Sequence, residues 1–165
     1  MATTTPPAAP FDPDLATRVR AWVDDDPDPR TAEHLRALLA DAEAQADPDG
    51  RREPARADLA DRFRGTLEFG TAGLRGALGG GPNRMNRAVV IRAAAGLVRY
   101  LGERLAEPGD ETDRGVGGPR VVIGYDARYD SDVFARDTAA VVVAAGGQAL
   151  LLPEPLPTPV LAFAV

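Results

Sequence analysis

A strand–helix–strand pattern near the end of the chain restricts its fold more than any other feature. Val121–Ile123 is a continuous apolar run, as expected for a strand buried on both faces. An amphipathic helix follows it, capped by Asp130 or Ser131 and stopped by Gly146–Gly147. Gln148–Leu152 is a second apolar run, and the short joins predict a right-handed parallel crossover. The chain is therefore expected to contain an α/β domain.

Three short amphipathic helices are predicted before this region. The first covers Asp14–Val23 and ends at the acidic, proline-broken run Asp24–Pro29. Thr31 is expected to cap the second helix, and the third covers Ala55 to about Arg64. These helices are interpreted as an appendage packed on the α/β domain. The predicted organisation is a disordered tail at 1–10, a helical N-terminal extension at 11–66 and the domain at 67–165.

A glycine-rich segment opens the predicted domain. Gly70–Pro82 holds six glycines around Thr71 and Arg75. Glycine lets the backbone approach an anion closely, and a guanidinium presents a fork of donors that matches phosphate oxygens. By itself this pattern fits a phosphate site or a plain tight turn.

A long helix is predicted after the glycine-rich segment. Asn86 is expected to cap it, and it runs to about Leu105. Its inward face is predicted to consist of Val90, Ala94, Leu97, Leu101 and Leu105.

Two polar segments follow the two predicted parallel strands. Asp126–Arg128 comes after the first strand, and Pro153–Thr158 comes after the second. Ligands of parallel sheets bind beyond the carboxyl ends of the strands, so both segments are candidates for a binding edge. An acid and an arginine two residues apart are equally suited to bracing a loop.

Composition excludes several kinds of site. All 19 basic residues are arginine, so the chain has no lysine for a Schiff base or a P-loop. It has no cysteine, and a lone histidine, His34, cannot build a zinc site, so no metal site is expected in this chain. The net charge of −6 disfavours nucleic acid, and no apolar run reaches membrane-spanning length. We expect a cytoplasmic protein with neither nucleic acid nor membrane as a partner.

Several segments, in order, resemble signatures of one enzyme superfamily. They are FGTAGLRG at Phe69–Gly76, GPNRMN at Gly81–Asn86, GYDAR at Gly124–Arg128 and LPEPLPTP at Leu152–Pro159. Together they resemble the α-D-phosphohexomutase superfamily, in the branch of bacterial phosphoglucomutases, phosphomannomutases and their phosphopentomutase relatives. Trp22 and the acidic DPDP run resemble the helical extension of that branch. The resemblance implies an α/β three-layer sandwich with a mixed, mostly parallel sheet, preceded by a helical extension.

The resemblance also implies a mechanism. A phosphoserine donates its phosphoryl group to a hexose phosphate, with glucose favoured, and the resulting bisphosphate returns the other group to the serine. Mg²⁺ held by a later aspartate loop and a glucose 1,6-bisphosphate-type activator are the implied cofactors. Arg75 and Thr71 are expected to support the phosphoryl group, while Asp126 and Arg128 organise the substrate-binding edge. The implied partners are sugar phosphates and the remaining domains of the same chain.

The serine that this mechanism needs is expected outside the chain. The superfamily places it in a Thr-Ala-Ser-His-Asn-Pro type motif soon after the segment that corresponds to Pro155–Pro159. Ser131 is the chain's only serine, and Asp132 and Val133 follow it. Val160–Val165 is apolar with no polar stop, which favours a truncated helix. We expect the 165-residue chain to have no mutase activity alone and to be poorly soluble.

Two alternatives to an enzyme fragment remain at this point. One is a noncatalytic phosphosugar-binding or regulatory module of mutase ancestry. The other is a nucleotide-binding α/β domain, which the missing lysine and the absent dinucleotide fingerprint disfavour.

The DNA that follows codon 165 distinguishes the enzyme from the noncatalytic module. If the chain belongs to an enzyme, we expect a Ser-His-Asn-Pro motif within about two helical turns, because the predicted helix at Thr158 leads into that loop. Sequencing this DNA is the measurement. A stop codon in frame at this point would favour the module.

Overall fold

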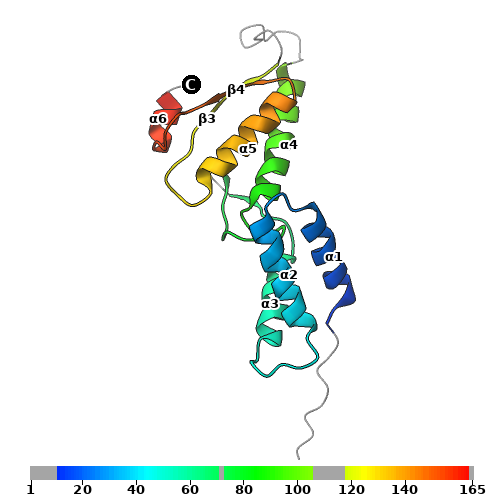
Figure 1. Ribbon diagram of the computed structural model, residues 1–165. Coiled ribbons are helices and arrows are strands. Elements are labelled where there is room, and N and C mark those ends of the chain that lie inside the picture. The colour runs from blue at the N-terminus through cyan, green and yellow to red at the C-terminus, as the bar shows by residue number, and fades with distance from the viewer. Residues whose placement is uncertain (1–10, 71–72, 106–117, 164–165) are drawn as a thin grey trace, which may run out of the picture. The chain divides into compact units, whose positions relative to one another are not determined.

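The computed structural model describes residues 11–70, 73–105 and 118–163 (Figure 1). Contacts divide the chain into two compact units, Met1–Met85 and Asn86–Val165. The domain boundary that the sequence predicts at residue 67 stays a prediction.

Three helices form most of the first unit, as the sequence predicts. They are α1 (Pro13–Asp25), α2 (Pro29–Glu43) and α3 (Arg52–Arg62), and Figure 1 shows α2 lying along both of the others. Their apolar faces meet in a common core, because the spacing of three and four residues puts each set on one side of its helix. This core consists of Leu15, Val19, Trp22, Val23, Leu35, Leu39, Leu59 and Phe63.

The cap of α2 differs from the prediction. Thr31 is the third residue of the helix, and Asp28 is the cap, with its Oδ1 accepting a hydrogen bond from Arg30 N at 3.0 Å. The reason is Pro29, which suits the first helical position because its ring presets φ and it has no N–H to satisfy. The Thr31 hydroxyl instead donates to Asp26 Oδ2 at 2.8 Å.

A short hairpin follows the helices. Strand β1 (Phe69–Gly70) pairs antiparallel with β2 (Gly73–Leu74), with Phe69 opposite Leu74.

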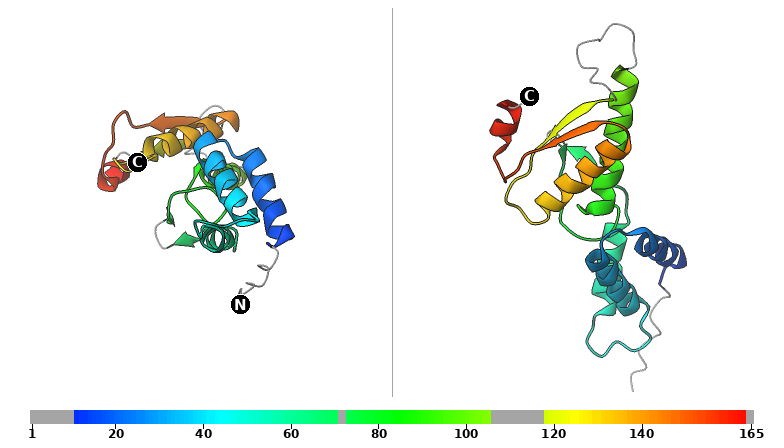
Figure 2. Two further views of the ribbon diagram at one scale, coloured as in Figure 1. Left: turned by 60° about the horizontal axis from the view of Figure 1, so that its bottom comes forward. Right: turned by 45° about the horizontal axis from the view of Figure 1, so that its top comes forward.

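The second unit contains the predicted strand–helix–strand pattern. Its elements are α4 (Arg87–Leu105), β3 (Arg120–Ile123), α5 (Ser131–Ala144), β4 (Gln148–Leu151) and α6 (Thr158–Phe163). Strands β3 and β4 are parallel, with Val122 opposite Leu150, which confirms the parallel pairing. Figure 2 shows α4 and α5 side by side and α5 against the sheet. The core between them consists of Val98, Ile123, Ala135 and Val142.

The start of α4 is as predicted, and its inward face is as predicted at Ala94 but not at Leu97. Asn86 caps the helix, since its Oδ1 accepts from Val89 N at 2.9 Å. Ala94 and Val98 are buried, whereas Leu97 is 48% exposed. The difference arises because α5 packs against the side of α4 that carries Val98.

Both ends of α5 lie where the sequence predicts them. Asp130 takes the cap position in a left-handed conformation (φ 60°), but its side chain makes no capping hydrogen bond, and Ser131 is the first helical residue. At the other end Gly146, with φ 81°, lets the chain leave the helix. The N–H groups of Gly146 and Gly147 donate to the carbonyls of Val143 and Val142, closing a Schellman motif.

The sheet is less buried than the sequence predicts. Val121 and Val122 are half-buried, and Leu150 and Leu151 are 46% and 38% exposed. Continuous apolar runs predict strands covered on both faces, whereas α4 and α5 pack on one face of this sheet. None of the helices in the described residues is long and apolar enough to cross a membrane.

A substitution at Gly147 tests the tight junction between α5 and β4. A Cβ there would lie 2.8 Å from the Pro119 carbonyl oxygen and 3.0 Å from Val142 Cγ1. We expect Gly147→Ala to lower the free energy of unfolding by about 1–3 kcal/mol because of this overpacking. Urea denaturation followed by circular dichroism measures it.

Gly96 in α4 provides the matched control, because a Cβ there meets nothing within 4 Å. Gly96→Ala should stabilise the chain by about 0.5–1 kcal/mol, since alanine loses less backbone entropy in a helix. Equal effects of the two substitutions would contradict the assignment of the junction.

Candidate functional site

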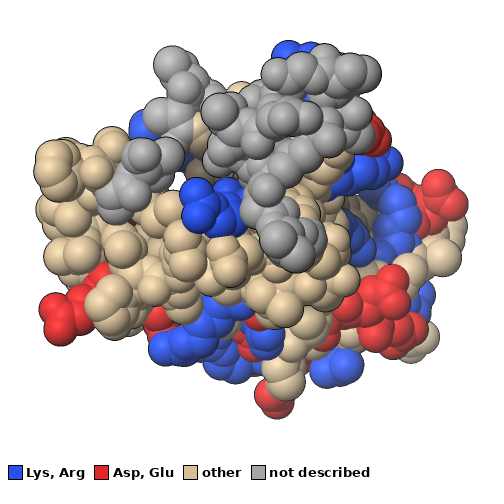
Figure 3. Space-filling model, turned by 90° about the horizontal axis from the view of Figure 1, so that it is seen from above, with Lys and Arg blue, Asp and Glu red and all other residues tan. Residues whose placement is uncertain are grey.

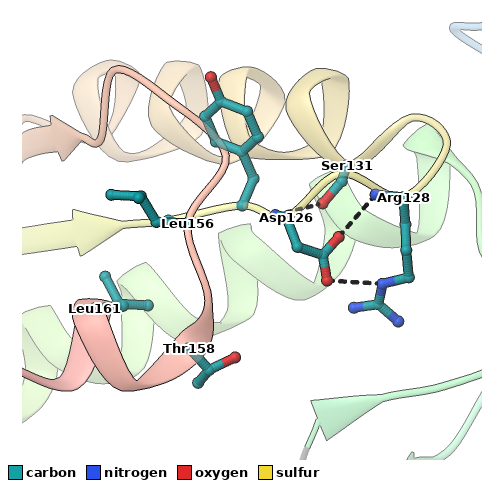
Figure 4. A pocket seen from close by; sticks show the side chains of 8 residues that line it. Asp126, Arg128, Ser131, Leu156, Thr158 and Leu161 are labelled. Carbon is teal, nitrogen blue, oxygen red and sulfur yellow. Dashed lines mark hydrogen bonds and ion pairs between the residues drawn. The ribbon is translucent and has the colours of Figure 1, made fainter.

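An open pocket lies at the carboxyl ends of the two parallel strands. Its volume is about 130 Å³, and it is drawn in Figure 4. The lining residues are Gly124, Tyr125, Asp126, Arg128, Ser131, Leu156, Thr158 and Leu161. They come from the loop after β3, the start of α5, the segment after β4 and α6. The two polar segments that the sequence places at one edge of the sheet are therefore together.

Backbone hydrogen bonds continue past the ends of the strands and join these two segments. Leu152 N donates to the Ile123 carbonyl, and Leu156 N donates to the Tyr125 carbonyl, both at 2.9 Å. The Tyr125 hydroxyl donates to the Pro153 carbonyl at 3.3 Å. The segment after β4 is thus held over the end of β3, and it forms one wall of the pocket.

Gly124 is needed where that wall comes close. A Cβ at this position would lie 3.2 Å from Leu152 Cδ1 and 3.3 Å from Leu161 Cδ1. The absence of a side chain lets α6 approach the end of β3 and close the apolar side of the pocket.

Asp126 and Arg128 form a local pair at the polar side. Asp126 Oδ1 accepts from Arg128 N at 3.1 Å, and Oδ2 accepts from Arg128 Nε at 2.8 Å (Figure 4). The hydrogen bond from the Arg128 backbone N–H is the main cause that lowers the pKa of Asp126, and the side chains of Arg128 and Ser131 lower it further. A carboxylate held in this way is charged at neutral pH and fixes the turn.

Arg128 can meet a ligand while it braces the turn. Its side chain is 86% exposed, and no ion pair or hydrogen bond joins its two terminal nitrogens to a described residue. A pocket with an outward guanidinium, the Thr158 hydroxyl and an apolar wall can bind an anionic ligand that has a neutral part.

The Ser131 hydroxyl accepts a hydrogen bond from Asp126 N at 3.3 Å, and no histidine lines the pocket. Ser131 therefore lacks the base that an activated serine needs.

The second candidate, the glycine-rich segment, belongs to the first unit. Arg75 directly follows β2, its side chain is exposed, and no described residue forms an ion pair or hydrogen bond with it. Figure 3 shows basic side chains next to acidic ones on one face of the chain. Thr71 lies outside the described residues. That Arg75 shares a pocket with Asp126 and Arg128 stays a prediction.

Sequence reasoning missed what the last glycines of this segment do. Gly79, Gly80 and Gly81 are packed against α2 and α3, where a Cβ would lie 2.6–3.0 Å from side-chain atoms of Arg62 or Leu35. These glycines therefore serve close packing. The sequence signal that indicates this packing is the Asp58–Arg62 pair at i,i+4 on α3, because it places a guanidinium at the end of the helix.

The described residues contain no group of three side chains that could hold a metal ion. The carboxylates at the pocket and on α3 are paired with arginines instead. This part of the chain does not fit a magnesium centre.

Comparison with known proteins gives a match over most of the α/β part. Residues 66–165 match the family described as phosphoglucomutase/phosphomannomutase, alpha/beta/alpha domain I. The match begins beside the boundary predicted at residue 67 and includes both candidate segments. No solved structure matches the chain.

Several curated proteins are similar to the chain. A probable phosphomannomutase of Haemophilus influenzae is 51% identical over 81 residues, which cover 49% of this chain and 14% of that protein. The phosphoribomutase of Saccharomyces cerevisiae is 32% identical over 155 residues, covering 92% and 21%. The glucose 1,6-bisphosphate synthase of Homo sapiens is 34% identical over 160 residues, covering 93% and 22%. The chain thus spans between 14% and 22% of the length of these relatives.

The titration of Asp126 tests the local pair. We expect its pKa to lie below the ordinary aspartate value of 3.8. Because the folded-state pKa is the lower one, the stability it contributes is complete above the ordinary value and is lost as the pH falls through the folded-state pKa. Carboxyl carbon chemical shifts, recorded against pH, measure the titration.

Arg128→Ala sharpens this test, since it removes the guanidinium and keeps the backbone N–H. The pKa of Asp126 should rise only part of the way, because the backbone hydrogen bond is the largest cause of its lowering. Arg136→Ala, which removes an ion pair to Asp132 on the same helix, is the control and should leave the Asp126 titration unchanged. A complete return to the ordinary pKa in Arg128→Ala would refute the role of the backbone N–H.

Proposed function

Because this chain belongs to the phosphoglucomutase/phosphomannomutase family, we propose that it is the amino-terminal part of a phosphosugar mutase. The proposed reaction interconverts hexose 1-phosphate and hexose 6-phosphate, with glucose phosphates as the favoured substrates. The observation that carries this proposal is Arg75, whose guanidinium is exposed and has no partner among the described residues. It lies within the residues that match the family, on backbone where glycines allow an anion to come close.

In the proposed mechanism a phosphoserine transfers its phosphoryl group to the free hydroxyl of a sugar monophosphate. The bond from the serine oxygen to phosphorus breaks, a bond from the sugar oxygen to phosphorus forms, and the sugar's hydroxyl proton ends on the serine oxygen. The resulting bisphosphate reorients, and its other phosphoryl group returns to the serine in the reverse exchange. Because the group in transfer carries most of the charge, its stabilisation by fixed cationic donors is the main task of the protein.

The residues of this chain take supporting roles in the proposal. Arg75 stabilises the group in transfer through charge-assisted hydrogen bonds, and Thr71 supports the same loop. Asp126 fixes the turn from which Arg128 contacts the substrate at the sheet edge. We place the phosphoserine outside this chain, because the Ser131 hydroxyl is engaged with Asp126 N.

Cofactors and partners are proposed for the whole enzyme. Mg²⁺ would neutralise phosphate charge there, with ligands outside the described residues, since these hold no suitable group. A glucose 1,6-bisphosphate-type activator would supply the phosphoryl group of the serine. The proposed partners are sugar phosphates and the remaining domains of the same protein. We propose the cytoplasm as the location, because charged sugar phosphates do not cross membranes unaided.

The complete first domain is proposed to be a three-layer sandwich with a mixed, mostly parallel sheet. The parallel pair β3–β4 with helices on one face supports this, as does the α/β/α description of the matched family. The exposed side chains of Leu150 and Leu151 are consistent with a further layer on the other face.

An activity assay tests the proposal. We expect protein from the complete reading frame to convert glucose 1-phosphate to glucose 6-phosphate, followed through a dehydrogenase that oxidises the product. Residues 1–165 alone should show no turnover, because the phosphoserine is missing. Mannose and pentose phosphates in parallel assays identify the preferred sugar. Binding of glucose 1-phosphate by the complete protein without turnover would favour the noncatalytic module.

Arg75→Ala in the complete protein should lower kcat by about 100-fold, the usual consequence of removing a fixed donor to the group in transfer. Arg36→Ala is the matched control, since Arg36 is also exposed and has no partner among the described residues. Equal kcat values for Arg75→Ala and the unmutated enzyme would remove Arg75 from the mechanism.

A further inference from the structure

The glycine-rich segment is fastened to the end of α3 by backbone and amide hydrogen bonds. Asn83 N donates to the Arg62 carbonyl at 3.0 Å, and Asn83 Nδ2 donates to the Asp61 carbonyl at 3.0 Å. Leu67 N donates to the Pro82 carbonyl at 2.8 Å, which closes the neck of the segment. Both ends of the segment are therefore fixed beside the same helix.

Arg62 fills the space between α3 and the glycines. Its side chain is only 10% exposed, with Nε bonded to Asp58 Oδ1 at 2.9 Å and one terminal nitrogen bonded to the Gly80 carbonyl at 3.1 Å. A Cβ at Gly79 would lie 2.6 Å from that guanidinium, and one at Gly81 would lie 3.0 Å from Arg62 Cβ. The glycines thus let the backbone rest directly on this side chain.

Arg84, just after the segment, forms a second link to α3. Its side chain is 14% exposed and bonds Asp61 Oδ2 at 2.6 Å, with Asp58 Oδ1 at 3.6 Å. The hydrogen bond from Arg84 lowers the pKa of Asp61, so the carboxylate stays charged at neutral pH. The link is therefore a charge-assisted one.

The link reaches Arg75 through a short chain of backbone contacts. Met85 N donates to the Ala77 carbonyl at 2.9 Å, and Gly79 N donates to the Met85 carbonyl at 3.1 Å. Met85 follows Arg84 directly, and Ala77 is two residues after Arg75. Two residues span only about 7 Å of extended chain, so fixing Ala77 restricts where Arg75 can stand.

We propose that Arg84, held by Asp61, is a positioning residue for Arg75, so that α3 of the helical extension sets the place of the guanidinium that stabilises the phosphoryl group in transfer. The part of the proposal that concerns phosphoryl transfer rests on the proposed function. Arg84 itself points at α3 and is assigned no contact with the substrate.

Hydrogen exchange of the complete protein tests the positioning without an activity assay. In Arg84→Ala, peptides that cover residues 75–85 should exchange about tenfold faster, because the segment loses a charge-assisted hydrogen bond. Peptides from α1 and α2 in the same sample report whether the helices stay folded. Asp61→Asn keeps the shape of the side chain, removes its charge and should also make these peptides exchange faster. It takes the place of Arg84→Ala if that substitution disturbs the helices.

Arg64→Ala is the matched control for the exchange experiment. Arg64 also pairs with Asp61, at 3.6 Å, but its side chain is 75% exposed and forms no ion pair or hydrogen bond with the described residues of the segment. It should leave the exchange of residues 75–85 unchanged. Unchanged exchange in both Arg84→Ala and Asp61→Asn would overturn the proposal.

A double-mutant cycle in the complete enzyme tests the functional part. Arg84→Ala should lower kcat about tenfold with little change in KM when Arg75 is present, and should have little further effect in Arg75→Ala, because it acts through that residue. Additive losses would refute the positioning role, since a general loss of stability does not depend on Arg75. If the unmutated enzyme has no mutase activity, the proposed function fails, and the exchange experiment still decides the coupling between α3 and the segment.

Discussion

The buried guanidinium of Arg62 is the interaction on which the first unit depends most. It satisfies the Gly80 carbonyl and the Asp58 carboxylate at once, and it occupies the space that side chains at Gly79 and Gly81 would need. Removing it would leave a buried carbonyl without this partner, which typically costs about 1–3 kcal/mol. Helices that look peripheral in the sequence are therefore part of the support of the glycine-rich segment.

In the second unit, the pocket depends on the parallel pairing of β3 and β4. Since β3 and β4 run in the same direction, the segments that follow them meet at one edge, and backbone hydrogen bonds hold Leu156 over Tyr125. The pocket is a consequence of this pairing and of Gly124, which leaves room for α6. Ligands of parallel sheets lie beyond the carboxyl ends of the strands, so this geometry makes the pocket the candidate binding site of the second unit.

The sequence predicts the elements better than it predicts their exposure. The three helices, the Asn86 cap, the Gly146 stop and the parallel pair follow from local patterns, because periodicity and capping are encoded in neighbouring residues. Burial depends on which layers are present, so the apolar runs of β3 and β4 and the Leu97 face of α4 were wrongly expected to be covered. At the site, Asp126 and Arg128 were found as a bracing pair, whereas the Arg84–Asp61 link joins residues 23 apart and leaves no local signal.

The bond from Asn83 N to the Arg62 carbonyl joins the two ends of the stretch that carries Arg75. Gly79, Gly80 and Gly81, near one of these ends, rest on Arg62 and Leu35. The length of chain between these contacts and Arg75 therefore limits how far its guanidinium lies from α3. An insertion there would displace the guanidinium without altering any side chain of the site.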